Sequence, residues 1–168
     1  AAPQRVAPGE KGWVAFAFDL SEGDAVYGPL AERIYFSVAG EESGLPFTVH
    51  AVAVDDFGGK EKAGAARCEV SPMYRHFGSV APGEDRTLDV RITNGGRSDL
   101  IVRSVSLRRG TECPLEAGTV VRPGASLTVP VTLKIGEEAY GPVAGGVSFV
   151  VNDPERPFRE VRVGAEVY

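Results

Sequence analysis

Short runs of alternating apolar and polar residues, separated by glycine and proline, constrain this chain more than any other feature of its sequence. In the first run, Val14, Phe16, Phe18 and Leu20 share one parity. Similar runs follow at 34–38, 47–54, 88–92, 100–102, 105–107, 127–133, 147–151 and 161–163. Because successive side chains of a strand point to opposite faces, each run predicts a strand with one buried and one wet face. No long stretch shows helical spacing, so the sequence predicts an all-β chain of short antiparallel strands.

Two parts of the chain repeat each other. The motif Tyr-Gly-Pro at Tyr27 returns 113 residues later at Tyr140, and the apolar positions after it follow at the same offset. The other matching pairs are Pro46-Phe47 with Pro157-Phe158, at an offset of 111, and Ala7-Pro8-Gly9 with Arg122-Pro123-Gly124. Residues 6–55 and 121–168 are therefore interpreted as the same structural half, built twice.

The two copies differ in what precedes them. Further strand-like runs extend from Phe77 to Val121 ahead of the second copy, whereas almost nothing precedes the first. A β-sandwich of about 100 residues needs some seven strands, and three strands are marginal alone. The sequence predicts an incomplete first module at 1–57, a Gly-rich linker at 58–73 and a complete sandwich at 74–168.

Several motifs in the second half resemble a known family. They are Phe77–Glu84 (FGSVAPGE), Leu88–Gly96 (LDVRITNGG), Ser98–Val102 (SDLIV), the Pro123-Gly124 turn and Val150–Pro154 (VVNDP). Their order and spacing resemble bacterial immunoglobulin-like (Ig-like) domains of the ASH (Hydin-related) type, and the match spans about Phe77 to Tyr168. The resemblance implies tandem antiparallel Ig-like β-sandwiches, the first incomplete, in an exported bacterial protein. Where the family often has Cys-Gly-Cys, this chain has one cysteine, Cys113, so no role of that pair transfers.

The resemblance also implies a location and a role. The protein is expected in the periplasm or on the cell surface, with a lipid anchor upstream of Ala1 as one form of attachment. It is expected to act as a non-catalytic structural or protein-interaction module whose partner the sequence does not name. Self-association through the incomplete first module is a further expectation, since exposed strands can accept another strand.

Turn residues carry a separate prediction. Asn94-Gly95-Gly96 separates two alternating runs, and a tight connection there is expected to need positive φ. Pro82-Gly83, Pro123-Gly124 and Asp153-Pro154 mark other strand joints. All are predicted to serve folding.

Composition narrows the classes of partner. The net charge is −5 and the pI is near 5.1, and no basic stripe could meet phosphates, so we expect no nucleic-acid partner. No apolar run approaches the roughly 18 residues of a membrane span. The N-terminal residues lack a signal-peptide apolar core, so a targeting segment is expected to have been removed or never present.

Catalytic and metal chemistry find little support. Nucleophilic catalysis needs Ser or Cys, a His base and an orienting group, and no G-x-S-x-G motif occurs. His50 is predicted on the wet face of its strand, and His76 is predicted to pack or hydrogen-bond beside Phe77. The acidic clusters are Asp19/Glu22/Asp24, Glu41-Glu42, Asp55-Asp56 and Glu137-Glu138. They are interpreted as solvated loop charge, with calcium as the alternative. We predict no catalytic, cofactor-binding or metal-binding residues.

The two cysteines leave an alternative open. A disulfide between Cys68 and Cys113 would suit an exported protein and stabilise it by about 2–4 kcal/mol. Two separate thiols are the favoured reading, because a bridge needs Cα atoms within roughly 7 Å.

Aromatic residues supply the candidate interaction surface. Trp13, whose parity differs from that of its apolar neighbours, is expected either at the surface or against the missing half of its module. Tyr74 and Phe77 flank the predicted junction and are expected to pack between the domains. Because β-sandwiches also bind sugars through exposed aromatics, a cell-surface carbohydrate-binding module is the alternative function. An enzyme is a third, and it would need a pocket holding His76, Cys68 and a carboxylate.

Overall fold

Strands dominate the computed structural model of the chain, which describes residues 5–13, 15, 17, 27–35, 37–38, 41–42, 46–58 and 64–168. These residues form β-strands and contain no α-helix. The all-β prediction is confirmed. The predicted run 14–20 and the acidic cluster at 19–24 lie almost wholly outside the described residues.

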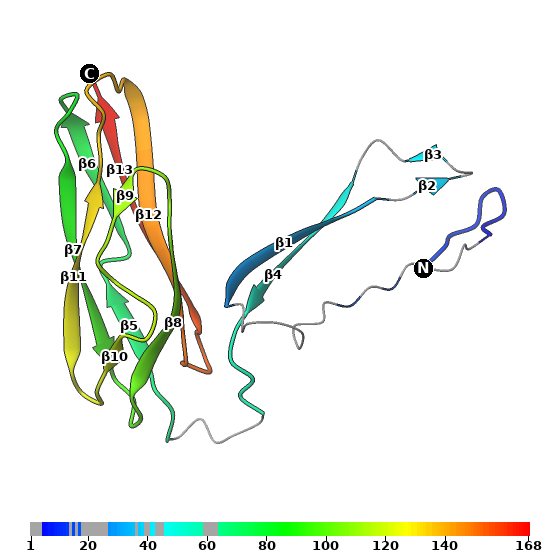
Figure 1. Ribbon diagram of the computed structural model, residues 1–168, viewed down its shortest axis with the longest axis horizontal. Coiled ribbons are helices and arrows are strands. Elements are labelled where there is room, and N and C mark those ends of the chain that lie inside the picture. Colours follow the sequence, from blue (N-terminus) through cyan, green and yellow to red (C-terminus); the bar gives the residue numbers. More distant parts are fainter. Residues whose placement is uncertain are drawn as a thin grey trace.

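Two sheets packed face to face make up the C-terminal part of the chain (Figure 1). One has the order β10-β8-β12-β13-β6, and its strands are Val120–Val121, Leu100–Leu107, Gly141–Val151, Phe158–Val167 and Tyr74–Val80. The other has the order β5-β7-β11-β9, and its strands are Cys68–Ser71, Arg86–Asn94, Ser126–Leu133 and Thr111–Glu112. All neighbours pair antiparallel except β6, which runs parallel to β13.

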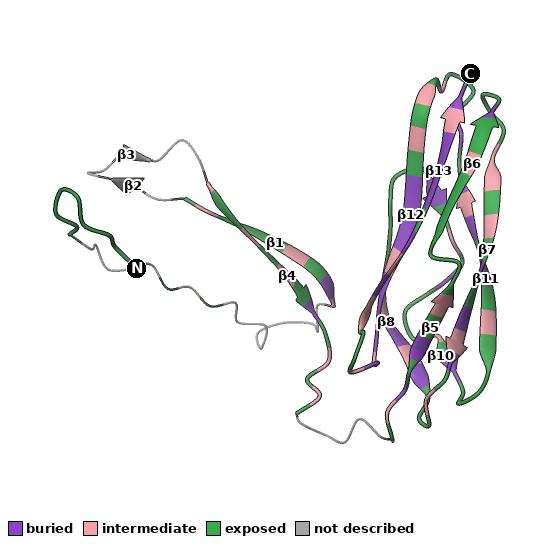
Figure 2. Cartoon of the chain, turned by 180° about the vertical axis from the view of Figure 1, so that it is seen from behind, coloured by how far each residue is buried: buried purple, intermediate pink, exposed green. Residues whose placement is uncertain are grey.

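The core of this sandwich lies between the two sheets. Ile92 and Val131 face inward from the smaller sheet, Val102 and Val161 from the larger one, and each is at most 1% exposed. The alternating sequence explains this arrangement, because every second residue of β7 and β11 enters the core while its neighbours face solvent (Figure 2). Close packing of branched side chains from both layers is what holds the sandwich together.

The predicted linker is shorter than expected. Strand β5 falls inside residues 58–73, yet it pairs with β7 from Cys68↔Asn94 to Ser71↔Arg91. The sandwich therefore includes residues before position 74, because β5 completes the edge of its four-stranded sheet. Residues 59–63 lie outside the described part of the chain.

A two-stranded hairpin precedes the sandwich. It consists of β1 (Gly28–Ile34) and β4 (Phe47–Ala53), and the short strands β2 (Ser37–Val38) and β3 (Glu41–Glu42) pair at its far end. All seven residue pairs of β1–β4, from Gly28↔Ala53 to Ile34↔Phe47, recur in β12–β13, from Gly141↔Val167 to Val147↔Val161. The offset is 113 for the first strand, as the repeat predicts, and 114 for the second. The predicted equivalence of Phe47 with Phe158 is therefore wrong in register, and Phe47 corresponds to Val161.

The Asn94-Gly95-Gly96 turn works differently from its prediction. Neither glycine has φ in the left-handed region. Glycine is needed at position 96 because a Cβ there would lie 2.7 Å from the carbonyl carbon of Ala66. Without a side chain, Gly96 leaves room for the segment that precedes β5. Asn94 is fully buried, and its amide accepts from the Arg67 and Gly96 N–H groups and donates to the carbonyls of Ser98 and Val121.

Candidate functional site

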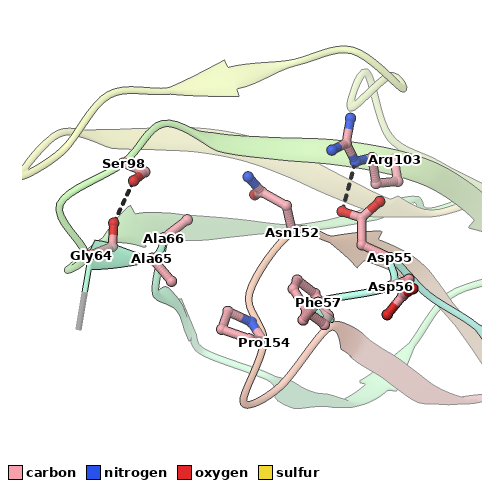
Figure 3. A pocket seen from close by; sticks show the side chains of 10 residues that line it. All are labelled: Asp55, Asp56, Phe57, Gly64, Ala65, Ala66, Ser98, Arg103, Asn152 and Pro154. Carbon is pink, nitrogen blue, oxygen red and sulfur yellow. Dashed lines mark hydrogen bonds and ion pairs between the residues drawn. The ribbon is translucent and has the colours of Figure 1, made fainter. Parts of the chain in front are cut away.

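A cavity of about 590 Å³ lies where the chain leaves the hairpin and reaches the sandwich (Figure 3). Its lining residues are Asp55, Asp56, Phe57, Gly64, Ala65, Ala66, Ser98, Arg103, Asn152 and Pro154. The first three follow β4, whereas Arg103 lies on β8 and Asn152 follows β12. The site is therefore a joint between two parts of the fold.

The joint is organised around the carboxylate of Asp55. Its Oδ1 accepts a hydrogen bond of 2.8 Å from the Tyr27 hydroxyl, and its Oδ2 lies 2.9 Å from Nε of Arg103. The Arg103 guanidinium also lies over the Tyr27 ring, with Cζ 5.9 Å from the ring centroid. Gly28 adds a close approach: at its φ of +113°, a Cβ would lie 3.4 Å from Oγ of Ser104. These contacts fasten the base of the hairpin to β8.

Electrostatics at the joint follow from these contacts. The hydrogen bond to Asp55, together with burial and the negative charge of that carboxylate, raises the pKa of the Tyr27 phenol above its ordinary value of 10.0. Tyr27 therefore stays a hydrogen-bond donor at neutral pH. The ion pair itself is partly exposed, with 33% of the Arg103 side chain and 16% of the Asp55 side chain accessible, so its strength is reduced by solvent.

The other polar groups of the cavity are also engaged. The Asn152 amide accepts from the N–H of Ile101 and donates to the carbonyl of Asp99. The Ser98 hydroxyl donates to the carbonyl of Gly64. The lining contains no His or Cys that could act as base or nucleophile. The arrangement is suited to holding two parts of a chain together, which is a structural task.

A buried ion pair ties β5 to the β12–β13 hairpin. Arg159 lies 3.2 Å from Asp153, and their side chains are only 9% and 3% exposed. Asp153 Oδ2 also accepts from the N–H of Cys68 at 2.9 Å, while Arg159 donates to the Cys68 carbonyl at 2.7 Å. Charges this deeply buried need such additional partners to offset their desolvation. The Asp153-Pro154 turn therefore anchors the first strand of the sandwich, in addition to forming a turn.

The two cysteines are free thiols. Cys68 lies on β5 and Cys113 follows β9, and these strands form opposite edges of the four-stranded sheet. Three strand spacings separate them, about 14 Å, which is beyond the roughly 7 Å that a disulfide spans. Burial raises the pKa of Cys68 to about 11 and raises that of Cys113 as well. Both are protonated at neutral pH and are poor nucleophiles.

The three aromatic residues of the predicted interaction surface differ in their exposure. Trp13 is 87% exposed and Tyr74 is 64% exposed. Phe77, on the same strand as Tyr74, is half-buried and packs against the sandwich core. The expectation that Phe77 packs between domains is therefore wrong, because its position on β6 turns it toward the core of its own sandwich. The aromatic residue at the joint is Tyr27, from the repeated Tyr-Gly-Pro motif, which was not among the predicted surface residues.

The histidines and acidic clusters do not converge. His50 is exposed on β4 and His76 is exposed on β6, where the His76 Nδ1 accepts a hydrogen bond from the Gly78 N–H at 3.1 Å. Among the described residues, no group of three or more His, Cys, Asp or Glu side chains could hold a metal ion. In that same part of the chain, no helix is long and apolar enough to cross a membrane.

Sequence reasoning missed the partners of the joint. Asp55 was grouped with loop acids, and nothing singled out Arg103, because the pair is separated by 48 residues in sequence. The available signal was the Tyr-Gly-Pro repeat, which contains Tyr27. The buried Arg159–Asp153 pair had no signal beyond the Asp-Pro turn.

Comparisons with solved structures identify the class of fold. A protein of unknown function from Porphyromonas gingivalis W83 is similar with a TM-score of 0.61 and 24% identity, over 86% of this chain and 68% of that one. The ASH/PapD-like domain of human CEP192 (PapD-like domain 7) is similar with a TM-score of 0.50 and 13% identity, over 65% of this chain and 89% of that domain. No protein-family model and no curated protein sequence matches the chain.

The fold and these comparisons define an Ig-like β-sandwich. Two packed and mainly antiparallel sheets are the feature that this class shares. In this chain the first two strands of the sandwich, β5 and β6, lie in different sheets. Residues 64–168 make up less than two thirds of the chain. The similarity to the Porphyromonas gingivalis protein, which covers 86% of it, therefore extends into the residues before the sandwich.

Proposed function

We propose that the chain is a non-catalytic pair of Ig-like modules, of the ASH type, that serves as a structural spacer and protein-interaction unit of an exported bacterial protein. In this proposal residues 1–57 form the second half of a first module, and the sandwich is the next module. The protein is exported to the periplasm or the cell surface, and its partner is a protein. Fold alone does not define a function, so the proposal depends on the joint.

The joint is the observation that carries this proposal. A spacer must hold successive modules in a defined relative position, and the Tyr27–Asp55–Arg103 contacts join the base of the hairpin to β8. The identical strand register of β1–β4 and β12–β13 supports the tandem organisation. Structural neighbours that are Ig-like or of unknown function are consistent with a module of this kind.

Distance measurements between spin labels test the role of the joint. Labels at Thr48→Cys on β4 and Ser79→Cys on β6 report the position of the hairpin relative to the sandwich; both positions are exposed. Cys113→Ser removes the half-exposed native thiol, and Cys68 is buried. We expect one narrow distance distribution that Asp55→Ala broadens. The matched control is Asp56→Ala, because among the described residues the Asp56 carboxylate accepts its one hydrogen bond from the nearby Gly58 N–H. A distribution that is equally broad in all three proteins would contradict a spacer with a fixed joint.

Exposure of Trp13 favours the second candidate, a cell-surface carbohydrate-binding module. A Trp that is 87% exposed offers a ring face to a sugar. Affinity electrophoresis in gels that contain soluble polysaccharides separates the two functions. A spacer migrates at the same rate in every gel. Retardation that Trp13→Ala abolishes, and that Tyr140→Ala at another exposed aromatic leaves unchanged, would replace the first proposal with the second.

A further inference from the structure

Strand edges are where an Ig-like sandwich can add a strand from another chain, because their outer N–H and C=O groups have no partner in the sheet. On the side of the larger sheet that β10 only partly covers, the longest such edge belongs to β8. Its outer neighbour, β10, pairs only with Leu100 and Ile101, and Thr119 and Gly118 bond the next residue, Val102. Past the joint at Arg103, no described strand pairs with that edge.

The ladder between β8 and β12 shows which groups point outward. The Arg108 N–H donates to the carbonyl of Gly146, so by the alternation of antiparallel pairs Ser106 and Ser104 also bond toward β12. The N–H and C=O groups of Val105 and Leu107 therefore point to the other side of β8, in the plane of the sheet, where no described strand pairs with them. Their spacing matches the bonding groups of an extended strand.

An apolar groove accompanies this edge. A cavity of about 390 Å³ is lined by Leu107, Glu112, Cys113, Pro114, Pro130 and Thr132. Leu107, the last residue of β8, is 44% exposed. A strand added to β8 could place every second side chain over this groove. Backbone bonds would supply affinity and the groove would supply specificity.

Two other long edges of the sandwich are protected. In the smaller sheet, Asn94 N–H donates to the carbonyl of Ala125, and the same alternation places the nitrogen of Pro130 on the open side of β11. Proline there removes the N–H that a new strand would use. On β6, Gly78 has a φ of +74° and its N–H is taken by the His76 side chain. Arg75 adds a charge to that edge.

Strand β8 has none of these devices past the joint: it has no proline and no charged side chain between Ser104 and Leu107. Proline, a positive φ and charge therefore protect these two edges, and the stretch of β8 past the joint has none of them. That contrast, within one sandwich, is what singles out β8.

Charge identifies the kind of partner. Arg108 and Arg109 follow Leu107 directly, and Arg109 makes no ion pair with any residue that the structure describes. A second copy of β8, paired antiparallel about Val105, would pair Arg103 of one copy with Leu107 of the other and place it diagonal to Arg109 of that copy. Like charges at neighbouring cross-strand positions are unfavourable. An acidic residue on an incoming strand would instead meet the free guanidinium of Arg109.

We propose that the edge of β8 at Val105–Leu107 binds an extended segment of a partner protein that has alternating apolar residues and a carboxylate near Arg109. The inference rests on the proposed function and names the surface through which the interaction takes place. Binding adds a sixth strand to the five-stranded sheet.

A phage-displayed library of random nonapeptides, selected on the full 168-residue chain, supplies the probes. We expect the selected peptides to alternate apolar residues and to be acidic at one end. Their synthetic forms are expected to shift the amide resonances of Val105 and Leu107. The critical variant is Val105→Pro, which removes an outward N–H and leaves the bonds of Ser104 and Ser106 to β12 in place.

The matched control is Tyr74→Pro on β6. Because the Arg162 N–H donates to the Met73 carbonyl, alternate residues of β6 face β13 and the Tyr74 N–H points outward. We expect Val105→Pro to weaken peptide binding by about tenfold or more, since a backbone bond is lost and the ring blocks the edge. Tyr74→Pro should leave binding within about twofold. Leu107→Glu, at the exposed groove, should weaken it as well and serves if Val105→Pro does not fold.

Three results would overturn the proposal. One is peptides that bind Val105→Pro and Leu107→Glu as tightly as the unmodified chain, or that shift resonances only outside β8. Another is a library that yields no binder. The third is a dimer, seen by light scattering, that Val105→Pro converts to a monomer, because the edge would then belong to a second copy. None of these results bears on the joint, since Asp55 and Arg103 are unchanged, so failure of the spacer is measured separately.

Discussion

The hairpin β1–β4 and the strand pair β12–β13 have the same register but different surroundings. In the sandwich, β12–β13 is flanked by β8 and β6 and faces the second sheet, so that Val161 and Val163 are 0% and 2% exposed. The equivalent residues of the hairpin are Phe47, which is 52% exposed, and Val49, which is half-buried. Figure 2 shows the same contrast: purple extends along much of β12 and β13, whereas β1 and β4 are mostly green and pink. Strand pairing alone therefore does not bury a face; a second layer does.

The largest expected effect exchanges the residues at one equivalent position. Gly145 of the sandwich corresponds to Glu32 of the hairpin. A Cβ at Gly145 would overlap Oγ1 of Thr111 and lie 2.9 Å from Cδ1 of Leu133, whereas Glu32 is exposed. We expect Gly145→Glu to destabilise the fold by about 4 kcal/mol or more, since it overpacks the core and buries a charge. Circular dichroism and thermal unfolding measure it.

The reverse change in the hairpin is the control. Glu32→Gly should cost about 1 kcal/mol at most, through the weaker strand preference of glycine. If the Gly145→Glu variant unfolds at the same temperature as the original protein, the second sheet does not cover position 145 more tightly than position 32 is covered in the hairpin.

The two ion pairs give the next largest contrast. Asp153→Ala leaves the buried Arg159 guanidinium without its carboxylate, and we expect a loss of about 3–5 kcal/mol in the free energy of unfolding. Asp55→Ala breaks a partly exposed pair at the joint, and it should cost about 1 kcal/mol or less. Urea titration of both variants checks this order. Equal losses would mean that the joint is as important to stability as the anchor of β5.

Matched valines sharpen the comparison. Val163→Ala removes two methyl groups from the closed core, and a loss of about 2–3 kcal/mol is expected from lost burial and the cavity left behind. Val49→Ala, at the equivalent hairpin position, should cost less than about 1 kcal/mol because the side chain is only half-buried. Chemical denaturation of both proteins measures the difference. Similar values would show that the hairpin face is covered as completely as the sandwich core.

The smallest effect is a pH dependence that reports on the sandwich alone, because both cysteines of the chain lie in it. Burial raises the pKa of Cys68 from 9.0 to about 11, so the folded state holds this proton more tightly than the unfolded chain does. The resulting stability is fully present below about pH 9 and is lost as the pH rises through about 11.

Comparison with Cys68→Ala isolates this contribution, which we expect to change by about 2 kcal/mol between pH 8 and 11. The difference in unfolding free energy between the two proteins, measured from pH 8 to 11, should narrow with increasing pH. A difference that stays constant would mean that Cys68 is not desolvated. Alkylation below pH 9 is expected to modify Cys113 before Cys68, because only Cys113 is partly accessible.

Much of the fold could be predicted from local patterns. The alternating runs around Ile92, Val131 and Val161 are strands in the structure, and their apolar faces form the core. The Tyr-Gly-Pro repeat indicated the equivalence of β1 and β12, because glycine at Gly28 and Gly141 adopts positive φ at the start of each strand. The register of the second strand was misassigned by three residues, since matching Phe47 to Phe158 used identity of side chain where the ladder follows backbone bonds.

The candidate site was far less predictable, because its contacts join distant segments. Asp55 and Arg103 are 48 residues apart, and the open edge of β8 is defined by which strands fail to pair with it. Alternation and turn residues, which act over a few neighbours, determine where strands form and which faces are apolar. The order of strands, the pairing of charges and the burial of one hairpin but not its twin depend on what packs against each element. That choice is made only when the whole chain has folded, because burial is a property of neighbouring layers and not of the strand itself.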